Sequence, residues 1–377
     1  MPDRHAEIAG AGLAGLTAAV LLARHGWSVT VHERSDALRE IGAGIFMWEN
    51  GVRALEEAGC AEQALGRGDR IGSWQVYDER NRQVQGGWMN PEGVRLFTVL
   101  RTDLHRALAD AARAEGVEIE CNSPVTGATP EGDLLLEDGR RLSADLVVGA
   151  DGVGSRVRDS LGLLRRLADL ADGCGRHLIP RFPDDPRGHT LEHWRGGRRV
   201  GIVPVSPDDV YVYLCCTAAD SAGRAKPLDV ESWTRAFPRL AGYFERIPDA
   251  GRWASFSDVT VSDWSSGRVC LLGDAAHAMS PNLGQGACVA MANAQALAHA
   301  LDRTDSVEGA LALWEASERP VTDHTQRYSR IYGRVGTRWP APLLDVRSAA
   351  VRVAGRSQRL QHHVNRAATH VSSLVSG

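Results

Sequence analysis

The chain begins with a short apolar segment, a glycine-rich turn and two further patterned segments. Residues 5–9 are apolar as in a buried strand, and residues 16–25 repeat apolar side chains at helical spacing. Gly26 stands where a helix stop is expected, and residues 28–32 alternate as a strand does. This strand–helix–strand order predicts a parallel sheet.

Similar pieces return later, separated by strand-rich stretches. A helix is predicted over residues 102–115, and the alanine-rich sequence from Gly284 onward predicts another. Residues 71–100 predict a β-hairpin with strands at 72–77 and 94–100, and residues 175–261 are expected to be mostly strands. Short apolar runs predict strands at residues 117–120, 134–136, 146–149, 200–205, 210–216 and 269–272.

This alternation predicts an α/β protein in which a strand-rich domain interrupts a Rossmann-like nucleotide-binding domain, followed by a helical C-terminus. The strand-rich insertions are well placed to build a second domain over the nucleotide site. The expected ranges are residues 1–70, 101–170 and 265–335 for the nucleotide-binding domain, 71–100 and 171–264 for the second domain, and 336–377 for the C-terminal helical segment.

Composition narrows the class of protein. The 377 residues are 43% hydrophobic and 24% charged, an ordinary globular balance, and the net charge of −4 gives no reason to expect nucleic-acid binding. No apolar run is long enough to span a bilayer, and Met1–Glu7 is too polar for a signal peptide, so we expect a cytoplasmic protein. The seven cysteines form no CxxC pair, which favours reduced thiols over disulfides or a metal site.

The glycine turn between the first strand and helix is a GxGxxG motif, Gly10 to Gly15. Its glycines permit a tight turn and let a pyrophosphate approach the next helix N-terminus. Glu33 follows the second strand, where a carboxylate can accept hydrogen bonds from ribose hydroxyls. The motif therefore predicts a dinucleotide with a free 2′-hydroxyl, which FAD and NAD both have.

Two further motifs follow buried strands, at residues 147–158 and 269–286. They place Asp151 and Asp274 at carboxyl ends of strands, where open α/β sheets bind ligands. The alternative for Asp274 is a plain helix N-cap. His277 is expected to be structural rather than a base. No GxSxG motif supports a serine hydrolase.

The three motifs, in this order and spacing, resemble the group-A FAD-dependent aromatic monooxygenases with the p-hydroxybenzoate hydroxylase-like fold. The resemblance covers residues 5 to about 330. It is closest to the branch that contains 2-methyl-3-hydroxypyridine-5-carboxylate oxygenase, which shares the runs at residues 42–45, 48–51 and 314–323. Ala292-Asn293 stands where many group-A members have Glu-Asp.

The resemblance implies FAD as cofactor and NADH or NADPH as co-substrate. The residues that it implies for FAD binding are Gly10, Gly12, Ala14, Gly15, Glu33, Arg34, Gly44, Arg101, Asp151, Gly273, Asp274, Gly284, Gln285 and Gly286. Those that it places at the catalytic, substrate-binding end are Tyr211, Arg199, Arg176 and Pro281.

At the substrate end, we expect Arg199 and Arg176 to hold a carboxylate and Tyr211 to contact a ring hydroxyl. The alternative for both arginines is a solvated surface position. Tyr211 and Tyr213 alternate on one strand, and we expect one to face inward and the other outward. Trp74 stands where the branch enzyme has a tyrosine, so the substrate can differ.

The implied activity is a single-component hydroxylation of a small aromatic or N-heteroaromatic ring that bears hydroxyl or carboxyl groups. NAD(P)H reduces FAD, O₂ adds at flavin C4a, and the hydroperoxide transfers an oxygen to the ring, after which ring opening can follow. The halogenase motif WxWxIP and the second glycine motif of Baeyer–Villiger enzymes do not occur. A reductase, a dehydrogenase or a non-enzymatic flavin-binding protein remains an alternative, and the oligomeric state is left open.

Overall fold

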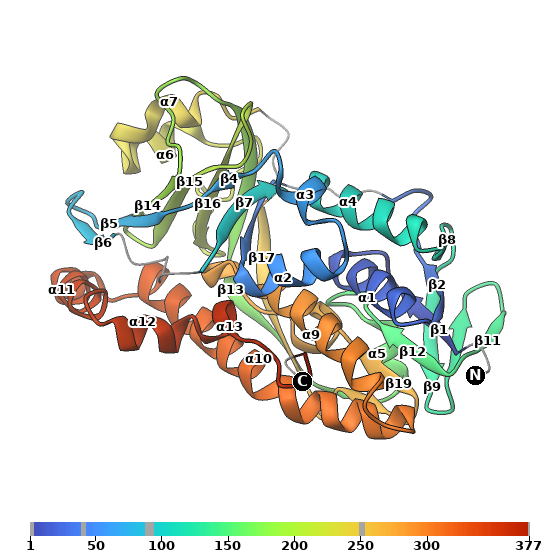
Figure 1. The fold of residues 1–377 in the computed structure, drawn as a ribbon. Helices are drawn as coiled ribbons and strands as arrows, with labels where there is room; N and C mark the ends of the chain where they lie inside the picture. The colour runs from blue at the N-terminus through green and yellow to red at the C-terminus, as the bar shows by residue number, and fades with distance from the viewer. Residues whose placement is uncertain (1–3, 39–42, 87–93, 249–252, 376–377) are drawn as a thin grey trace.

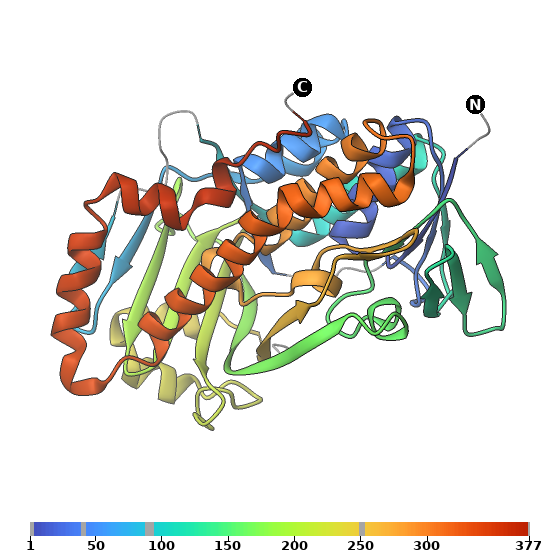
Figure 2. The same ribbon diagram turned by 90° about the horizontal axis from the view of Figure 1, so that it is seen from below.

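The computed structural model describes residues 4–38, 43–86, 94–248 and 253–375. Two sheets with different topologies lie side by side, and a long C-terminal helix runs across both regions (Figures 1 and 2). This confirms the predicted α/β class and the helical C-terminus. Among the described residues, no helix is long and apolar enough to cross a bilayer.

The first sheet has six strands in the order β18-β19-β12-β1-β2-β8. Its strands are β1 His5–Ala9, β2 Ser28–His32, β8 Glu118–Glu120, β12 Leu146–Gly149, β18 Ser265–Ser266 and β19 Val269–Leu271. All neighbours pair in parallel except β18 and β19. The predicted strand–helix–strand beginning is confirmed, because β1 pairs directly with β2 in the parallel sense.

Helices pack around this sheet and against one another. Its main helices are α1 Leu13–Arg24, α4 Arg101–Ala114 and α9 Gly286–Leu301, and shorter ones are α2 Glu49–Glu57, α3 Ala61–Leu65, α5 Arg156–Ser160, α8 Asp274–His277 and the 3₁₀ helix η2 Pro281–Leu283. Helix α1 contacts both α4 and α9. Its leucines at positions 16, 21 and 22 are completely buried, which anchors the glycine turn at its N-terminus.

The second sheet has seven strands in the order β17-β13-β16-β15-β14-β5-β6. They are β5 Ser73–Tyr77, β6 Gln83–Gln85, β13 Leu164–Pro180, β14 His189–Arg195, β15 Arg198–Pro204, β16 Asp209–Thr217 and β17 Trp253–Val261. The helices α6 Val230–Ala236, η1 Pro238–Leu240 and α7 Ala241–Phe244 lie beside it. The expectation of mostly strands therefore fails between residues 230 and 244, where Trp233 and Phe244 are buried from helices.

Two three-stranded sheets complete the fold. They consist of β3 Gly44–Trp48, β7 Leu96–Leu100 and β4 Asp69–Arg70, and of β11 Arg141–Ser143, β10 Asp133–Leu136 and β9 Val125–Thr129. The predicted hairpin over residues 71–100 is wrong in its pairing: β5 turns back onto β6, whereas β7 pairs with β3 and β4. Strand β7 thus belongs to a separate three-stranded sheet and not to the seven-stranded one.

The C-terminal part is a long helix followed by a chain of short ones. Helix α10, Val307–Thr337, contains Pro320, and its successors are η3 Ala341–Leu343, α11 Leu344–Ala354, α12 Gln358–Val364 and α13 Arg366–Thr369. Helix α10 packs on α9, α11 reaches β6 of the seven-stranded sheet, and α13 returns to α2 (Figure 2). This segment therefore connects the outer edge of the seven-stranded sheet to the helices that pack around the six-stranded sheet.

Candidate active site

In the glycine turn, Gly10 and Gly15 lie against other backbone atoms, whereas Gly12 faces open space. Gly10 has φ +99° and donates its N–H to the His32 carbonyl at 2.8 Å. A Cβ on Gly15 would lie 2.0 Å from the Gly10 carbonyl oxygen, so Gly15 lets the helix pack on the turn. A Cβ on Gly12 would meet no heavy atom of the described residues within 4 Å. Gly12 therefore borders space in which a ligand can approach the backbone.

Glu33 lies beside this turn, and its neighbour Arg34 is exposed. The Glu33 carboxylate accepts hydrogen bonds from the N–H groups of Ala11, at 3.1 Å, and Ser35, at 2.9 Å. These two bonds hold the half-buried carboxylate next to the N-terminus of α1. A carboxylate has about four lone-pair sites, so it keeps acceptor capacity for a ribose hydroxyl.

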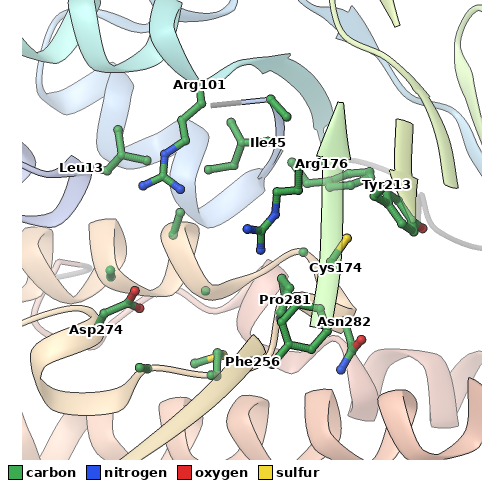
Figure 3. Close-up of a pocket in the computed structure, with 18 of the residues that line it drawn as sticks. Leu13, Ile45, Arg101, Cys174, Arg176, Tyr213, Phe256, Asp274, Pro281 and Asn282 are labelled. Atoms are coloured by element: carbon green, nitrogen blue, oxygen red, sulfur yellow. The ribbon is translucent and has the colours of Figure 1, made fainter. Parts of the chain in front are cut away.

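A cavity of about 550 Å³ extends from this turn to the seven-stranded sheet, and we call it the main cavity. Arg101 and Arg176 enter it from one side, and Asp274 faces them from the other (Figure 3). Predicted site residues that line it are Gly12, Ala14, Gly44, Arg101, Arg176, Arg199, Tyr211, Gly273, Asp274, Pro281, Gly284 and Gly286. The remaining ones, Gly10, Gly15, Glu33, Arg34, Asp151 and Gln285, do not line it.

Asp274 is the first residue of α8, and its side chain is accessible in the cavity although it lies deep in the molecule. Desolvation raises the pKa of its carboxyl group, and the guanidinium groups of Arg101 and Arg176 act in the opposite direction. The N-cap of α8 is Gly273, and no side chain caps this helix. The plain N-cap interpretation of Asp274 is therefore wrong.

Two helix N-termini open onto the main cavity. Helix α1 begins after Gly12 and α9 begins after Gln285, and neither N-cap residue makes a side-chain capping bond. The unpaired N–H groups and the positive end of each helix dipole favour an anion or an electron-rich carbonyl. The Gln285 side chain points elsewhere: its Nε2 donates to Asn365 Oδ1 at 2.9 Å.

Asp151 lies next to the cavity rather than in its lining. Its Oδ2 accepts from the N–H groups of Arg156 at 2.7 Å and Val157 at 3.3 Å, which caps the start of α5. Its Oδ1 is buried and has no hydrogen-bond partner among the described residues. A buried acceptor without a partner is costly, so a hydroxyl or amide of a bound ligand would stabilise this position.

The end of the main cavity at the seven-stranded sheet contains Tyr211, Tyr213 and Arg176. The expectation that one tyrosine faces outward is wrong, because residues two apart on a strand share a face. Both are buried and line the cavity, with ring centroids 5.7 Å apart. Burial raises the pKa of Tyr211, while the guanidinium of Arg176 lowers it. Gly44 is required here, since its Cβ would lie 2.9 Å from Tyr211 Cβ.

Arg199 is not a surface residue, since it is only 1% exposed, but its guanidinium already has protein partners. Nη2 donates to Asn282 Oδ1, and Nη1 lies 3.6 Å from Oε1 of Glu192. Arg176, in contrast, is exposed within the cavity. Arg176 is therefore the arginine whose side chain is accessible in the cavity, while Arg199 compensates the buried carboxylate of Glu192.

Glu192 is a site residue that the sequence analysis missed. It is 1% exposed and accepts hydrogen bonds from Tyr213 and from Trp194 Nε1 at 2.5 Å. Tyr332 of α10 donates to it at 3.3 Å. In sequence, Glu192 lies between Leu191 and His193 in a run that mixes polar and apolar residues, so no local signal marks it. Cys174, Cys215, Phe46, Phe256, Met279 and Asn282 are further cavity residues that were not singled out.

His277 is not among the described residues that line the main cavity. Its Nε2 accepts a hydrogen bond from Asn293 Nδ2 at 3.1 Å, and its ring lies 5.4 Å from that of Trp264. Burial lowers its pKa to about 4, so the ring is neutral at physiological pH. This geometry is that of a structural histidine.

These observations fit an FAD-shaped ligand. Gly12 leaves space at a helix N-terminus, a second uncapped N-terminus opens at Gly284–Gly286, and Asp151 has an unpaired oxygen nearby. Pyrophosphate, isoalloxazine carbonyl and ribityl hydroxyls offer the complementary groups. Gly42, also part of the quoted motifs, lies outside the described residues.

Comparison with known protein sequences identifies a matching family and related enzymes. The profile of the FAD binding domain family matches residues 4–322. A 2-heptyl-3-hydroxy-4(1H)-quinolone synthase from Mycobacteroides abscessus is 37% identical over 354 residues, 91% of this chain and 94% of the relative. An FAD-dependent urate hydroxylase from Mycolicibacterium vanbaalenii is 31% identical, covering 82% and 83%.

Comparison with solved structures also identifies an oxygenase. The tetrameric form of 2-methyl-3-hydroxypyridine-5-carboxylic acid oxygenase superposes with a TM-score of 0.88 at 35% identity, covering 100% of both chains.

Proposed function

The chain belongs to the FAD-binding-domain family of aromatic monooxygenases, and from this premise we propose that it hydroxylates the N-heteroaromatic ring of a small substrate with NAD(P)H and O₂. In the balanced reaction, ring C–H, O₂, NAD(P)H and a proton give ring C–OH, NAD(P)⁺ and water. One oxygen atom enters the ring and the other leaves as water.

The observation that carries this proposal is that one cavity joins a cofactor end to a substrate end. Gly12, Asp274 and Gly284 border the cofactor end, while Arg176 and Tyr211 border the other. FAD, when bound, accepts a hydride from NAD(P)H and activates O₂. A ring held between Tyr211 and the α9 N-terminus would then lie next to the flavin.

For the cofactor, we assign the pyrophosphate to the turn at Gly12 and the N-terminus of α1. Glu33 accepts from the adenosine ribose, and Asp274 accepts from hydroxyls between the two ends of the cofactor. Arg101 adds positive charge on the side of the main cavity that lies opposite Asp274 (Figure 3). The Gly284–Gly286 backbone and the α9 dipole stabilise negative charge on the flavin ring.

For the substrate, Arg176 and Tyr211 act on an oxygen substituent of the ring. The pKa of Tyr211 is raised, so its hydroxyl stays protonated and can donate a hydrogen bond. The positive charge of Arg176 favours the deprotonated form of a ring hydroxyl, which makes the ring carbons more nucleophilic. Phe46, Trp74 and Phe256 line the cavity and exclude water from the reacting atoms.

The choice of an N-heteroaromatic ring rests on the relatives. A quinolone, urate and a hydroxypyridine are named for the three proteins compared above, and all three are nitrogen heterocycles. A substrate carboxylate of the kind expected from the sequence would pair with Arg176 and not with Arg199, because Arg199 already faces Glu192.

The test is a substrate panel on FAD-loaded protein. NADH and NADPH oxidation and O₂ uptake are measured with 2-heptyl-4(1H)-quinolone, urate and 2-methyl-3-hydroxypyridine-5-carboxylate, with benzoate as a ring without nitrogen. We expect a heterocycle to stimulate NAD(P)H oxidation and to gain one oxygen by mass. Turnover that persists without O₂ would indicate a reductase, and oxidation that yields only peroxide with every ring would contradict the proposal.

A further inference from the structure

A second cavity adjoins the main one and differs from it in character. It has a volume of about 290 Å³ and lies between α10, α11 and α12 of the C-terminal segment and strands β5 and β14. We call it the tail cavity. Its side chains are mostly apolar, among them Leu283, Ile331, Val335, Val351, Leu360 and Val364.

Trp74 and Asn282 line both cavities, so they form the boundary between them. The Trp74 ring is held by stacking on Phe46, with centroids 4.8 Å apart. Asn282 is fixed by Arg199 and by the Ser329 carbonyl. The boundary is therefore a fixed feature next to the substrate end, and a molecule lying across it would occupy both cavities.

Trp74 also carries a polar group that points to a ligand. Its Nε1 is buried and has no hydrogen-bond partner among the described residues. A buried donor without a partner is costly. An acceptor atom on a molecule at the boundary would satisfy it, as the oxygen of a ring ketone can.

The volume and the lining residues of the tail cavity determine which kind of molecule can bind there. An apolar cavity of about 150 Å³ holds one benzene molecule of six carbons. At about 290 Å³, the tail cavity has roughly twice that volume, so it accommodates an unbranched chain of up to about twelve carbons. Among the described residues that line it there is no lysine or arginine, so these residues offer no counter-ion to a carboxylate or phosphate terminus.

We propose that the substrate carries an unbranched alkyl chain, which crosses between Trp74 and Asn282 into the tail cavity while the heteroaromatic ring stays beside Arg176 and Tyr211. This inference rests on the proposed function and narrows its substrate class to alkyl-substituted N-heterocycles. The C-terminal helices then determine specificity, although they lie outside the nucleotide-binding domain.

The test is a chain-length series on FAD-loaded protein. The dissociation constants of 4(1H)-quinolones with methyl, propyl, pentyl and heptyl groups at position 2 are measured by calorimetry, and turnover is measured in parallel. About 0.8 kcal/mol per buried methylene corresponds to roughly fourfold tighter binding for each added methylene. Equal affinity across the series, or no binding by any member, overturns the inference.

Two variants of α11 locate the chain. Val351 lines the tail cavity, whereas Val353 on the same helix is 68% exposed and does not line it. Val351→Phe should weaken heptyl binding by tenfold or more and leave the methyl compound unchanged, and Val353→Phe should change neither. Loss of both ligands alike in Val351→Phe, with the fold intact by circular dichroism, contradicts the proposal.

The readouts separate this inference from the proposed function. Chain-dependent binding without hydroxylation of any ring would refute the function and keep the tail cavity. Hydroxylation with chain-independent binding would support the proposed function and refute the tail cavity as the site of an alkyl chain. If sedimentation shows that Val351→Phe changes the oligomeric state, the apolar surface is an interface between copies of the chain, and the inference is overturned.

Discussion

Gly12→Val tests whether the glycine turn receives the cofactor. Gly12 has φ −75° and ψ −179°, an extended conformation that valine also adopts. A Cβ there meets no atom within 4 Å in the part of the chain that the structure describes. The folded apoprotein should therefore tolerate the change within about 1 kcal/mol. The new side chain would instead occupy the approach to the α1 N-terminus.

The expected loss concerns FAD affinity. A hydrogen bond to a charged group contributes about 1.5–3 kcal/mol, so losing one to the pyrophosphate weakens binding about tenfold to a hundredfold. Fluorescence quenching during titration of apoprotein with FAD gives the dissociation constant, and urea unfolding gives the stability.

Two other glycines provide controls. Gly242→Val, at an exposed position in α7 with no heavy atom near the new Cβ, should change FAD affinity little. Gly15→Ala should destabilise the apoprotein by about 1–3 kcal/mol, because its Cβ would lie 2.0 Å from a backbone oxygen. The reasoning is refuted if Gly12→Val is folded and binds FAD as tightly as the wild type.

Three further predictions follow from the same geometry. Asp274→Ala should leave the free energy of unfolding nearly unchanged, because the side chain is accessible in the cavity. It should weaken FAD binding about tenfold or more in the same fluorescence titration, and unchanged affinity would exclude Asp274 from the site. Arg199→Ala should cost about 3–5 kcal/mol of stability in urea unfolding, because it leaves Glu192 buried without its cation. Arg176→Ala should mainly raise KM for the heteroaromatic substrate, and equal effects of the two variants on stability would contradict these assignments. Burial lowers the pKa values of His177, His193 and His277 to about 4, below the unfolded value of 6.5, so the unfolded chain binds more protons between these limits. Stability should then fall as pH drops from about 6.5 to 4, by up to roughly 3 kcal/mol for each histidine, and His277→Gln should make the slope shallower.

The sequence predicted those parts of the fold that depend on local patterns. Strands β1, β2 and β12 occur at the expected residues because apolar runs next to glycine turns have few alternative structures. The partner of β7 could not be predicted, because pairing with β3 depends on residues about 50 positions earlier in the chain.

The site shows the same division. Gly12, Asp274 and Gly284 belong to motifs that carry their own spacing, and all three line the main cavity. Glu192 is recognisable only once Tyr213, Tyr332 and Arg199 are seen around it. The tail cavity is likewise formed by three C-terminal helices packing against a distant sheet, which no local pattern announces.

The central claim is that this protein transfers one oxygen atom from O₂ to a nitrogen heterocycle. The most direct measurement is turnover of 2-heptyl-4(1H)-quinolone by FAD-loaded protein with NAD(P)H under ¹⁸O₂, followed by mass spectrometry of the product. We predict a hydroxylated product that carries one ¹⁸O atom, with one NAD(P)H oxidised for each product formed. A product labelled only from ¹⁸O-water, or no product from any heterocycle of the panel, would contradict the account.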